Sequence, residues 1–103
     1  MKHLPIMLLL MLGLSGLFVA APSMSDEDHQ QARRLKELGE ILPLEQILIK
    51  AKAKQPGRVI EVELKNEDGR HVYEVELLNE SGEVWELYFD AVTGELIKRE
   101  REN

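Results

Sequence analysis

Apolar residues downstream of Gly57 recur at every second position and alternate with mostly acidic residues. The alternation covers three stretches, residues 60–64, 73–77 and 85–89. A period of two is typical of β-strands that bury one face. A fourth strand is expected from about Glu95 to Arg99, with Leu96 or Ile97 turned inward. The pattern therefore predicts four strands in succession.

Turn residues separate these strands and set their register. Each intervening segment contains a glycine suited to a positive φ: Gly69, Gly82 and Gly94. Apolar residues occupy even positions in the first strand and odd positions in the next two. The first loop must therefore have an even length, as in residues 68–69 or 66–69, and the second an odd length, as in residues 80–82. The second register pairs Leu77 with Trp85, Val75 with Leu87, and Tyr73 with Phe89.

Upstream of Gly57 the apolar period becomes that of a helix. Pro43 suits a first turn, the apolar positions that follow recur at helical spacing, and residues 55–57 end the segment. An earlier helix is expected from about Asp26 to Leu38, capped by Ser25 and ended near Gly39. Its apolar stripe is thin, so residues 24–40 are interpreted as a loosely docked helical leader or linker.

Together these elements predict an α+β fold. A helix, with a looser leader helix before it, packs on a four-stranded antiparallel β-meander. The domain is expected to cover residues 41–103.

The N-terminus has a separate character. Residues 1–3 are a short basic start, and residues 4–21 carry no charge. Small residues follow at 19–23, which favours a signal peptide over residues 1–23, cleaved somewhere within 21–25. The alternative is an N-terminal membrane anchor, although Gly13 and Gly16 weaken the segment as a spanning helix. We therefore expect a periplasmic or secreted protein with no stable membrane span after the signal is removed.

Composition changes this picture in three ways. The chain has 13 Lys+Arg, 19 Asp+Glu and no Cys, with a net charge of −6. Without cysteine there is no disulfide scaffold, thiolate metal site or thiol nucleophile. The acidic balance argues against nucleic-acid binding, which requires basic residues to neutralise phosphates. Removing the signal takes away Lys2 and no acid, so the mature chain is more acidic still, at −7.

The chemistry of single residues is sparse. The histidines are His3, His29 and His71, and their spacing fits no metal motif. None of the serines lies in a nucleophile motif. We therefore predict no catalytic residues, no metal site and no cofactor. A further set of residues is assigned to turns and chain reversal: Pro56, Gly57, Gly69, Gly82, Asp90, Thr93 and Gly94.

The segments around several of these turns resemble the PepSY domain family. The resemblance rests on residues 55–59, Asp68-Gly69, Gly82 and, most specifically, residues 90–95, DAVTGE, which close an aromatic strand. It implies an exported or envelope domain, which occurs alone after a signal peptide and in propeptides of thermolysin-type metallopeptidases. In those propeptides an inhibitory or chaperoning role is inferred, and the family carries no shared catalytic residues. We expect a small exported protein in which the domain stands alone.

One sheet face is predicted to be acidic. Glu76 should lie opposite Glu86, and Glu61 opposite Glu74 or Glu76, where like charges are mildly destabilising. The simplest interpretation is a solvated face, partly neutralised by Lys98 or Arg99. The alternatives are docking of a basic protein and weak binding of divalent cations. The predicted partner-binding residues are Glu61, Glu74, Glu76, Glu86 and Tyr88.

Three functional classes follow from these observations. The favoured one is a non-catalytic interaction module that binds an envelope protein, with restraint of a peptidase as a candidate role. Exposed edge strands would also permit such a module to add an extended peptide. A small-molecule or metal-binding envelope carrier is the alternative. An enzyme is the least favoured, because the sequence shows no nucleophile with its base.

Overall fold

The computed structural model describes residues 21–102. The predicted signal peptide therefore lies almost entirely outside the described residues. Helix α2 (Asp26–Glu37) begins at Ser25, whose hydroxyl accepts a hydrogen bond from the Asp28 amide at 3.1 Å. Three acidic residues occupy its first turn, where they face the positive end of the helix dipole. Gly39, with φ +73°, follows the helix as predicted.

Helix α3 (Leu44–Lys54) follows Pro43 and buries Ile47 and Ala51 completely. Lysines in its last turn suit the negative end of the dipole. Gln55 ends it in an extended conformation, which leads the chain into the sheet.

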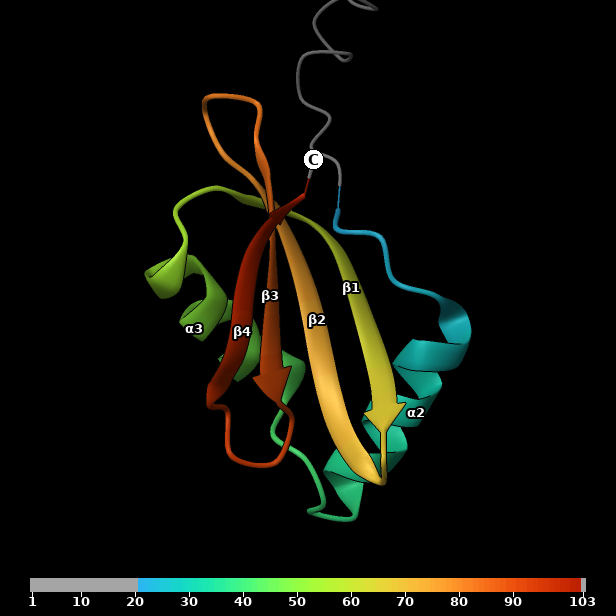
Figure 1. Cartoon of the computed structure of the whole chain (residues 1–103). Helices are drawn as coiled ribbons and strands as arrows, with labels where there is room; N and C mark the ends of the chain where they lie inside the picture. The colour runs from blue at the N-terminus through green and yellow to red at the C-terminus, as the bar shows by residue number, and fades with distance from the viewer. Residues whose placement is uncertain (1–20, 103) are drawn as a thin grey trace, which may run out of the picture.

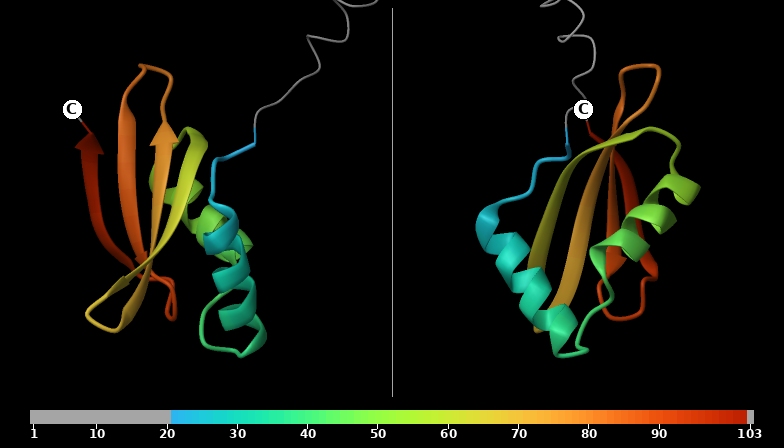
Figure 2. Two further views of the ribbon diagram at one scale, coloured as in Figure 1. Left: turned by 90° about the vertical axis from the view of Figure 1, so that its right-hand side faces the viewer. Right: turned by 180° about the vertical axis from the view of Figure 1, so that it is seen from behind.

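Four strands form one antiparallel sheet in the order β1-β2-β3-β4 (Figure 1). They are β1 (Arg58–Glu67), β2 (Arg70–Leu78), β3 (Val84–Asp90) and β4 (Leu96–Glu102). Both helices lie on the same face of the sheet, and the opposite face is open (Figure 2). The predicted α+β fold, two helices and a four-stranded meander, is confirmed.

The predicted registers are also confirmed, except at the start of β1, where a register shift pairs Val59 and not Ile60 with Leu77. Asp68 and Gly69 form a two-residue loop with positive φ at both positions, and Glu67 pairs with Arg70. Residues 80–82 form the second loop, with φ +82° at Gly82. The three expected pairs between β2 and β3 are present: Leu77 with Trp85, Val75 with Leu87, and Tyr73 with Phe89.

Apolar side chains between the sheet and the helices form the core. The largest completely buried ones are Tyr73, Phe89, Ile47, Leu77 and Leu87. On β4 it is Leu96 that packs against this core, while Ile97 is exposed. The alternation of β1, β2 and β3 thus separates one apolar face from one polar face.

The segment before α2 is attached to the edge of β1 by backbone bonds. The Ser23 amide donates to the Ile60 carbonyl, and the Val62 amide donates to the Ser23 carbonyl, both at 2.9 Å. Asp28 on α2 then accepts a hydrogen bond from the Leu64 amide at 3.0 Å. Leu35 adds a buried apolar contact. The thin apolar stripe of α2 is therefore supplemented by polar bonds, which the hydrophobic pattern does not show.

No helix within residues 21–102 has the length and apolar character needed to cross a bilayer.

Candidate functional site

Glutamates form a row across the open face of the sheet, one from each strand. Glu61 pairs with Glu76, Glu76 with Glu86, and Glu86 with Glu100. Directly opposite residues on neighbouring strands have Cβ atoms about 5 Å apart, and like charges at that separation destabilise the sheet. The row confirms the predicted pairing of Glu76 with Glu86 and selects Glu76 as the partner of Glu61.

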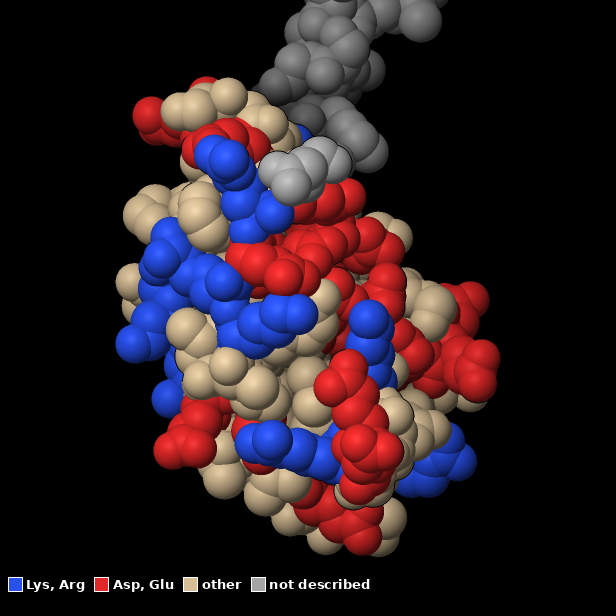
Figure 3. All heavy atoms as spheres, in the orientation of Figure 1, with Lys and Arg blue, Asp and Glu red and all other residues tan. Residues whose placement is uncertain are grey.

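A second row lies beside the first. It runs from Glu63 through Glu74 and Tyr88 to Lys98. Glu102, opposite Val84, extends the acidic surface along β4. Figure 3 shows acidic atoms gathered over the sheet, with basic side chains next to them. We call this surface the glutamate face, and its acidic members are Glu61, Glu63, Glu74, Glu76, Glu86, Glu100 and Glu102.

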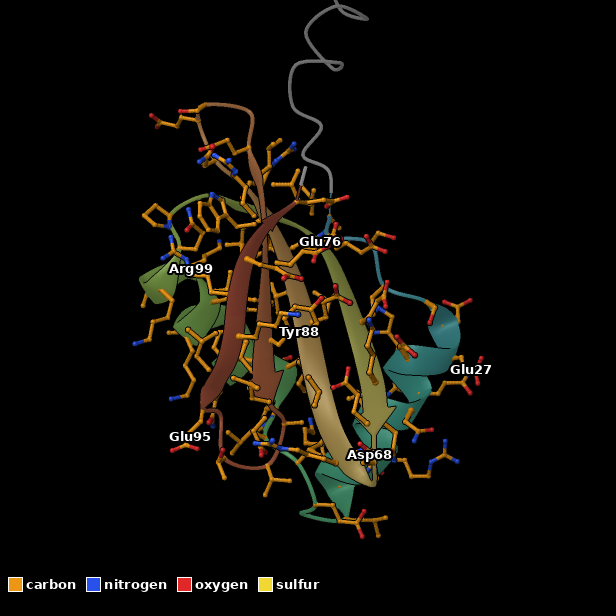
Figure 4. All side chains as sticks on the ribbon, viewed as in Figure 1. Glu27, Asp68, Glu76, Tyr88, Glu95 and Arg99 are labelled. Atoms are coloured by element: carbon orange, nitrogen blue, oxygen red, sulfur yellow. The ribbon has the colours of Figure 1, made fainter. Side chains whose placement is uncertain are left out.

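Tyr88 lies at the middle of the glutamate face (Figure 4). Its hydroxyl oxygen is 2.9 Å from Oε1 of Glu74 and 3.2 Å from Oε2 of Glu86. A phenol carries one proton, so the hydroxyl donates to one carboxylate at a time. Burial, and then these two carboxylates, raise the pKa of Tyr88, which keeps the hydroxyl a donor. Tyr88 therefore links glutamates on two adjacent strands.

Two lysines partly neutralise the face. Lys65 Nζ is 2.8 Å from Oε2 of Glu74, whose side chain is only 9% exposed. The hydrogen bond to Glu74 raises the pKa of Lys65, so the ammonium stays charged. Lys98 Nζ is 3.3 Å from Oε2 of Glu100 and lies 5.3 Å from the centre of the Tyr88 ring. The glutamates of the first row thus keep an excess of negative charge.

Glu76 has the most strongly raised pKa of these glutamates. Burial, a hydrogen bond with Glu61 and then the charges of neighbouring glutamates raise its pKa from 4.5 to about 7. Burial is also the leading cause of the raised pKa of Glu63 and Glu86. Glu76 and Glu86 of the first row, and Glu63 of the second, therefore keep their protons to higher pH than isolated glutamates do.

The same carboxylates are the candidates for binding a cation. Within residues 21–102, one group of potential metal ligands comes together: Glu74, Glu76 and Glu86, with ligand oxygens within 4.8 Å of one another. Two neighbouring strands supply all three, so the oxygens spread over a flat surface. A tight Ca²⁺ site requires six to eight converging oxygens. The arrangement suits charge attraction better than selective coordination.

The closing turn of the domain is built around Asp90. Its Oδ1 accepts hydrogen bonds from the amides of Val92 at 2.8 Å and Thr93 at 3.1 Å, while Oδ2 accepts one from Arg70 at 2.9 Å. Burial raises the pKa of Asp90, but these bonds outweigh burial and leave it below its usual value. Thr93 Oγ1 accepts from the Glu95 amide at 3.2 Å, and Gly94 has φ +78°.

The remaining turn residues lie away from the glutamate face or at its ends. Pro56 and Gly57 connect α3 to β1, while Gly69 and Gly82 lie in the two hairpin loops. The five predicted partner-binding residues, in contrast, are brought together on one surface. Glu100 and Glu102 were missed, because β4 was expected to end near Arg99 and extends to Glu102. Their charged segment has no apolar alternation that could indicate a strand.

These features define a small two-layer α+β domain with an open acidic sheet face. The sequence profile of the family described as "Peptidase propeptide and YPEB domain", or PepSY, matches residues 41–100. This match covers more than half of the 103 residues, and the chain belongs to the PepSY family. No curated protein and no solved structure shows a significant match.

Replacing Glu76 by glutamine is expected to stabilise the protein above pH 7. A folded-state pKa raised above the unfolded value favours folding at low pH, and this advantage is lost as the pH rises from about 4.5 to about 7. The gain from the substitution should be about 1 kcal/mol, because solvent screening reduces the effect on a partly exposed surface. Urea unfolding at pH 5 and pH 8 measures it.

The matched control is Glu27→Gln, which removes the same charge from the exposed first turn of α2. Its effect on stability should differ little between the two pH values. If the free energy of unfolding changes equally between pH 5 and pH 8 in Glu76→Gln and in the unsubstituted protein, the assignment of the raised pKa to Glu76 is contradicted.

Proposed function

We propose that this chain is an exported, non-catalytic PepSY module that binds a basic surface of an envelope or secreted protein through the glutamate face. The observation that carries the proposal is the row of four glutamates in matched register on a sheet face that the helices leave open. Such a row costs stability in the free protein. A basic partner would remove that cost on binding, which favours association.

The proposed partner class includes peptidases, because the family is associated with peptidase propeptides. A propeptide-like module acts by binding and needs no catalytic group of its own. The features of the closing turn support this view, since Asp90 and Thr93 are engaged in hydrogen bonds that shape the backbone. Export is proposed from the N-terminal residue pattern, with the cut within residues 21–25. A cut after Ala21 would keep both the Ser23 bonds and the Ser25 cap.

The binding surface can be tested with a matched pair of double variants. Glu76→Gln/Glu86→Gln removes two charges from the glutamate face, and Glu27→Gln/Glu37→Gln removes two from α2. At pH 8, above the raised pKa of Glu76, both have the same net charge, so any difference measured there reports the position of the charges. We expect the first to weaken binding of a lysine- and arginine-rich peptide about fivefold to tenfold at low salt, and the second to change it little. Isothermal titration calorimetry measures both.

Equal weakening by the two double variants would show that net charge alone attracts the peptide, and would contradict a specific surface. Ca²⁺ and Zn²⁺ titrations of the same protein test the alternative function, in which the glutamate face carries a cation instead of binding a protein. Heat from either ion that disappears in Glu76→Gln/Glu86→Gln would favour the carrier over protein binding.

Restraint of a peptidase is tested separately. The purified protein, at tens of micromolar, is assayed against a panel of secreted thermolysin-type metallopeptidases. Inhibition that is relieved by Glu76→Gln/Glu86→Gln would support the regulatory role. Unchanged peptidase activity across the panel, together with intact peptide binding, would exclude restraint of this peptidase class. The proposal of a protein-binding module would still stand.

A further inference from the structure

The outer edge of β1 is covered by the chain's own N-terminal part. Residues 21–37, which we call the covering segment, run along this edge as an extended stretch followed by α2 (Figure 1). The match to the PepSY family begins at residue 41, so the covering segment lies outside the family domain. The domain by itself would therefore leave the backbone groups of β1 open at this edge.

The covering segment pairs with β1 as a parallel strand one residue long. Ser23 forms a parallel bridge with Glu61, and it makes its two backbone bonds with the residues on either side of Glu61. In a longer parallel strand, the next bond would join the Leu64 amide to the carbonyl of Ser25. Asp28 takes that amide instead, through a carboxylate oxygen at 3.0 Å. A side chain therefore replaces the second carbonyl of a strand.

Part of this edge is left without a partner. The amide and the carbonyl of one strand residue point to the same side, so the carbonyls of Val62 and Leu64 point towards the covering segment. Neither carbonyl accepts a hydrogen bond from residues 21–102. A cavity of about 420 Å³ is lined by the covering segment and by residues 61–64. A longer extended strand would therefore form more backbone bonds with β1 than the covering segment does.

The side chains of the covering segment show what each face of an added strand would meet. Met24 packs against the hydrophobic core, whereas Ser23 lies on the same face as Glu61. Because side chains alternate along a strand, the second position after Ser23 would lie beside Glu63. A serine cannot form an ion pair with either glutamate, but a lysine or an arginine can. The edge therefore favours a basic–apolar–basic triplet over the serine–methionine–serine that the chain supplies.

We propose that the β1 edge binds an extended segment of a partner protein that carries this triplet, and that the covering segment is displaced by it. The added strand runs parallel to β1, in the direction of Ser23, and its basic side chains reach Glu61 and Glu63. Most residues of α2 are exposed, so little apolar contact opposes the displacement. The inference rests on the proposed function, because it identifies the basic part of the partner as an added strand.

The test uses the purified protein and two pentapeptides with blocked ends. The first has the sequence alanine–lysine–methionine–lysine–alanine. The second carries a methyl group on the backbone nitrogen of its first lysine. The methyl group keeps the charge and removes the donor that would replace the Ser23 amide on the Ile60 carbonyl. Binding is followed by ¹⁵N–¹H NMR.

We expect the first peptide to move the Ser23 amide signal to its position in an unfolded chain. The Val62 amide should stay protected from exchange, because the peptide carbonyl replaces that of Ser23 as its acceptor. The methylated peptide should bind at least fivefold more weakly. Equal affinity of the two peptides, or binding that leaves the Ser23 signal in place, would overturn the proposal.

Two variants test the role of the covering segment. Asp28→Ala removes the acceptor of the Leu64 amide and should free the edge, so the first peptide should bind about threefold to fivefold more tightly. The matched control is Asp26→Ala, which removes the same charge from the same turn of α2 and should change affinity little. An affinity of Asp28→Ala no higher than that of Asp26→Ala would contradict displacement of the covering segment.

The same titrations separate this inference from the proposed function. If Glu76→Gln/Glu86→Gln binds the first peptide more weakly, but the peptide leaves the Ser23 amide in place, the glutamate face stands and strand addition is overturned. If the peptide displaces Ser23 and binds the double variant as tightly as the unsubstituted protein, strand addition stands. The row that contains Glu76 and Glu86 then fails as the binding surface.

Discussion

Gly57→Ala is expected to lower the free energy of unfolding by about 3 kcal/mol or more. Gly57 has φ +150°, a conformation that residues with a side chain rarely adopt. A Cβ atom at this position would lie 2.7 Å from the carbonyl oxygen of Leu78 and 3.1 Å from its carbonyl carbon. Both are backbone atoms at the point where Arg58 pairs with Leu78, so neither can move without disturbing the β1–β2 ladder.

The matched control is Gly82→Ala. Gly82 also has a positive φ, +82°, but a Cβ atom there would meet no atom within 4 Å. Its cost should be limited to the backbone conformation, about 1 kcal/mol. Chemical denaturation of both variants separates the two effects. A similar loss in both would show that the approach of Leu78 to Gly57 does not determine the result.

The sheet could be predicted in detail because its signals agree with one another. The apolar positions of β2 and β3 share one parity, and Gly82 permits an odd loop. A shift of one residue would turn either Val75 or Leu87, with the other apolar residues of its strand, from the core to solvent, so a single register satisfies both conditions. This agreement between turn and hydrophobic pattern made the pairing of Tyr73 with Phe89 predictable.

Other features of the fold depend on contacts that the hydrophobic periodicity of the sequence does not indicate. The register shift between Val59 and Glu61 pairs Val59 with Leu77, so Val59 is buried where the alternation of residues 60–64 placed Ile60. The bond from the Leu64 amide to Asp28 joins residues 36 positions apart. Such bonds are determined by the packing of α2 on β1. The apolar pattern of the sequence does not contain them, and it therefore predicts only a loosely docked leader.

Part of the glutamate face could be predicted from the alternation of polar and apolar residues in the strands. The alternation of β1, β2 and β3 placed Glu61, Glu76 and Glu86 on one face. Glu100 completes the row because β3 offers a free edge with which the charged end of β4 pairs. The central position of Tyr88, bonded to two glutamates, depends on side-chain geometry and follows from the structure alone.

Asp90→Ala is expected to lower the free energy of unfolding by about 3 kcal/mol at pH 7. The carboxylate is buried and accepts bonds from the Val92 and Thr93 amides and from Arg70. Its removal leaves two amides of the closing turn without their acceptor, and hydrogen bonds to a charged group are worth about 1.5–3 kcal/mol. The Gly94 amide donates to the Asp90 carbonyl at 2.8 Å and would keep this acceptor. The turn around it would no longer be held by the Asp90 carboxylate.

Two further variants divide this loss into its parts. Asp90→Asn keeps an oxygen that can accept from the two amides and loses the charge, so its cost should be smaller than that of alanine. Arg70→Ala removes the ion pair alone, and since the Arg70 side chain is 52% exposed, its cost should be below about 1 kcal/mol. Urea unfolding at pH 7 ranks the three variants. A loss in Arg70→Ala as large as in Asp90→Ala would assign the stability to the ion pair instead of the turn.

The pH dependence gives an independent check on the role of Asp90. Its folded-state pKa is held below the ordinary 3.8, so its contribution is complete above that value and is lost as the pH falls through the folded-state pKa. Glu76 has the opposite sign, because its stabilising effect is lost as the pH rises towards about 7. The unsubstituted protein should therefore be most stable near pH 4–5. In a plot of the free energy of unfolding against pH, Asp90→Asn should flatten the acid side and leave the neutral side unchanged. Glu76→Gln should flatten the neutral side and leave the acid side unchanged.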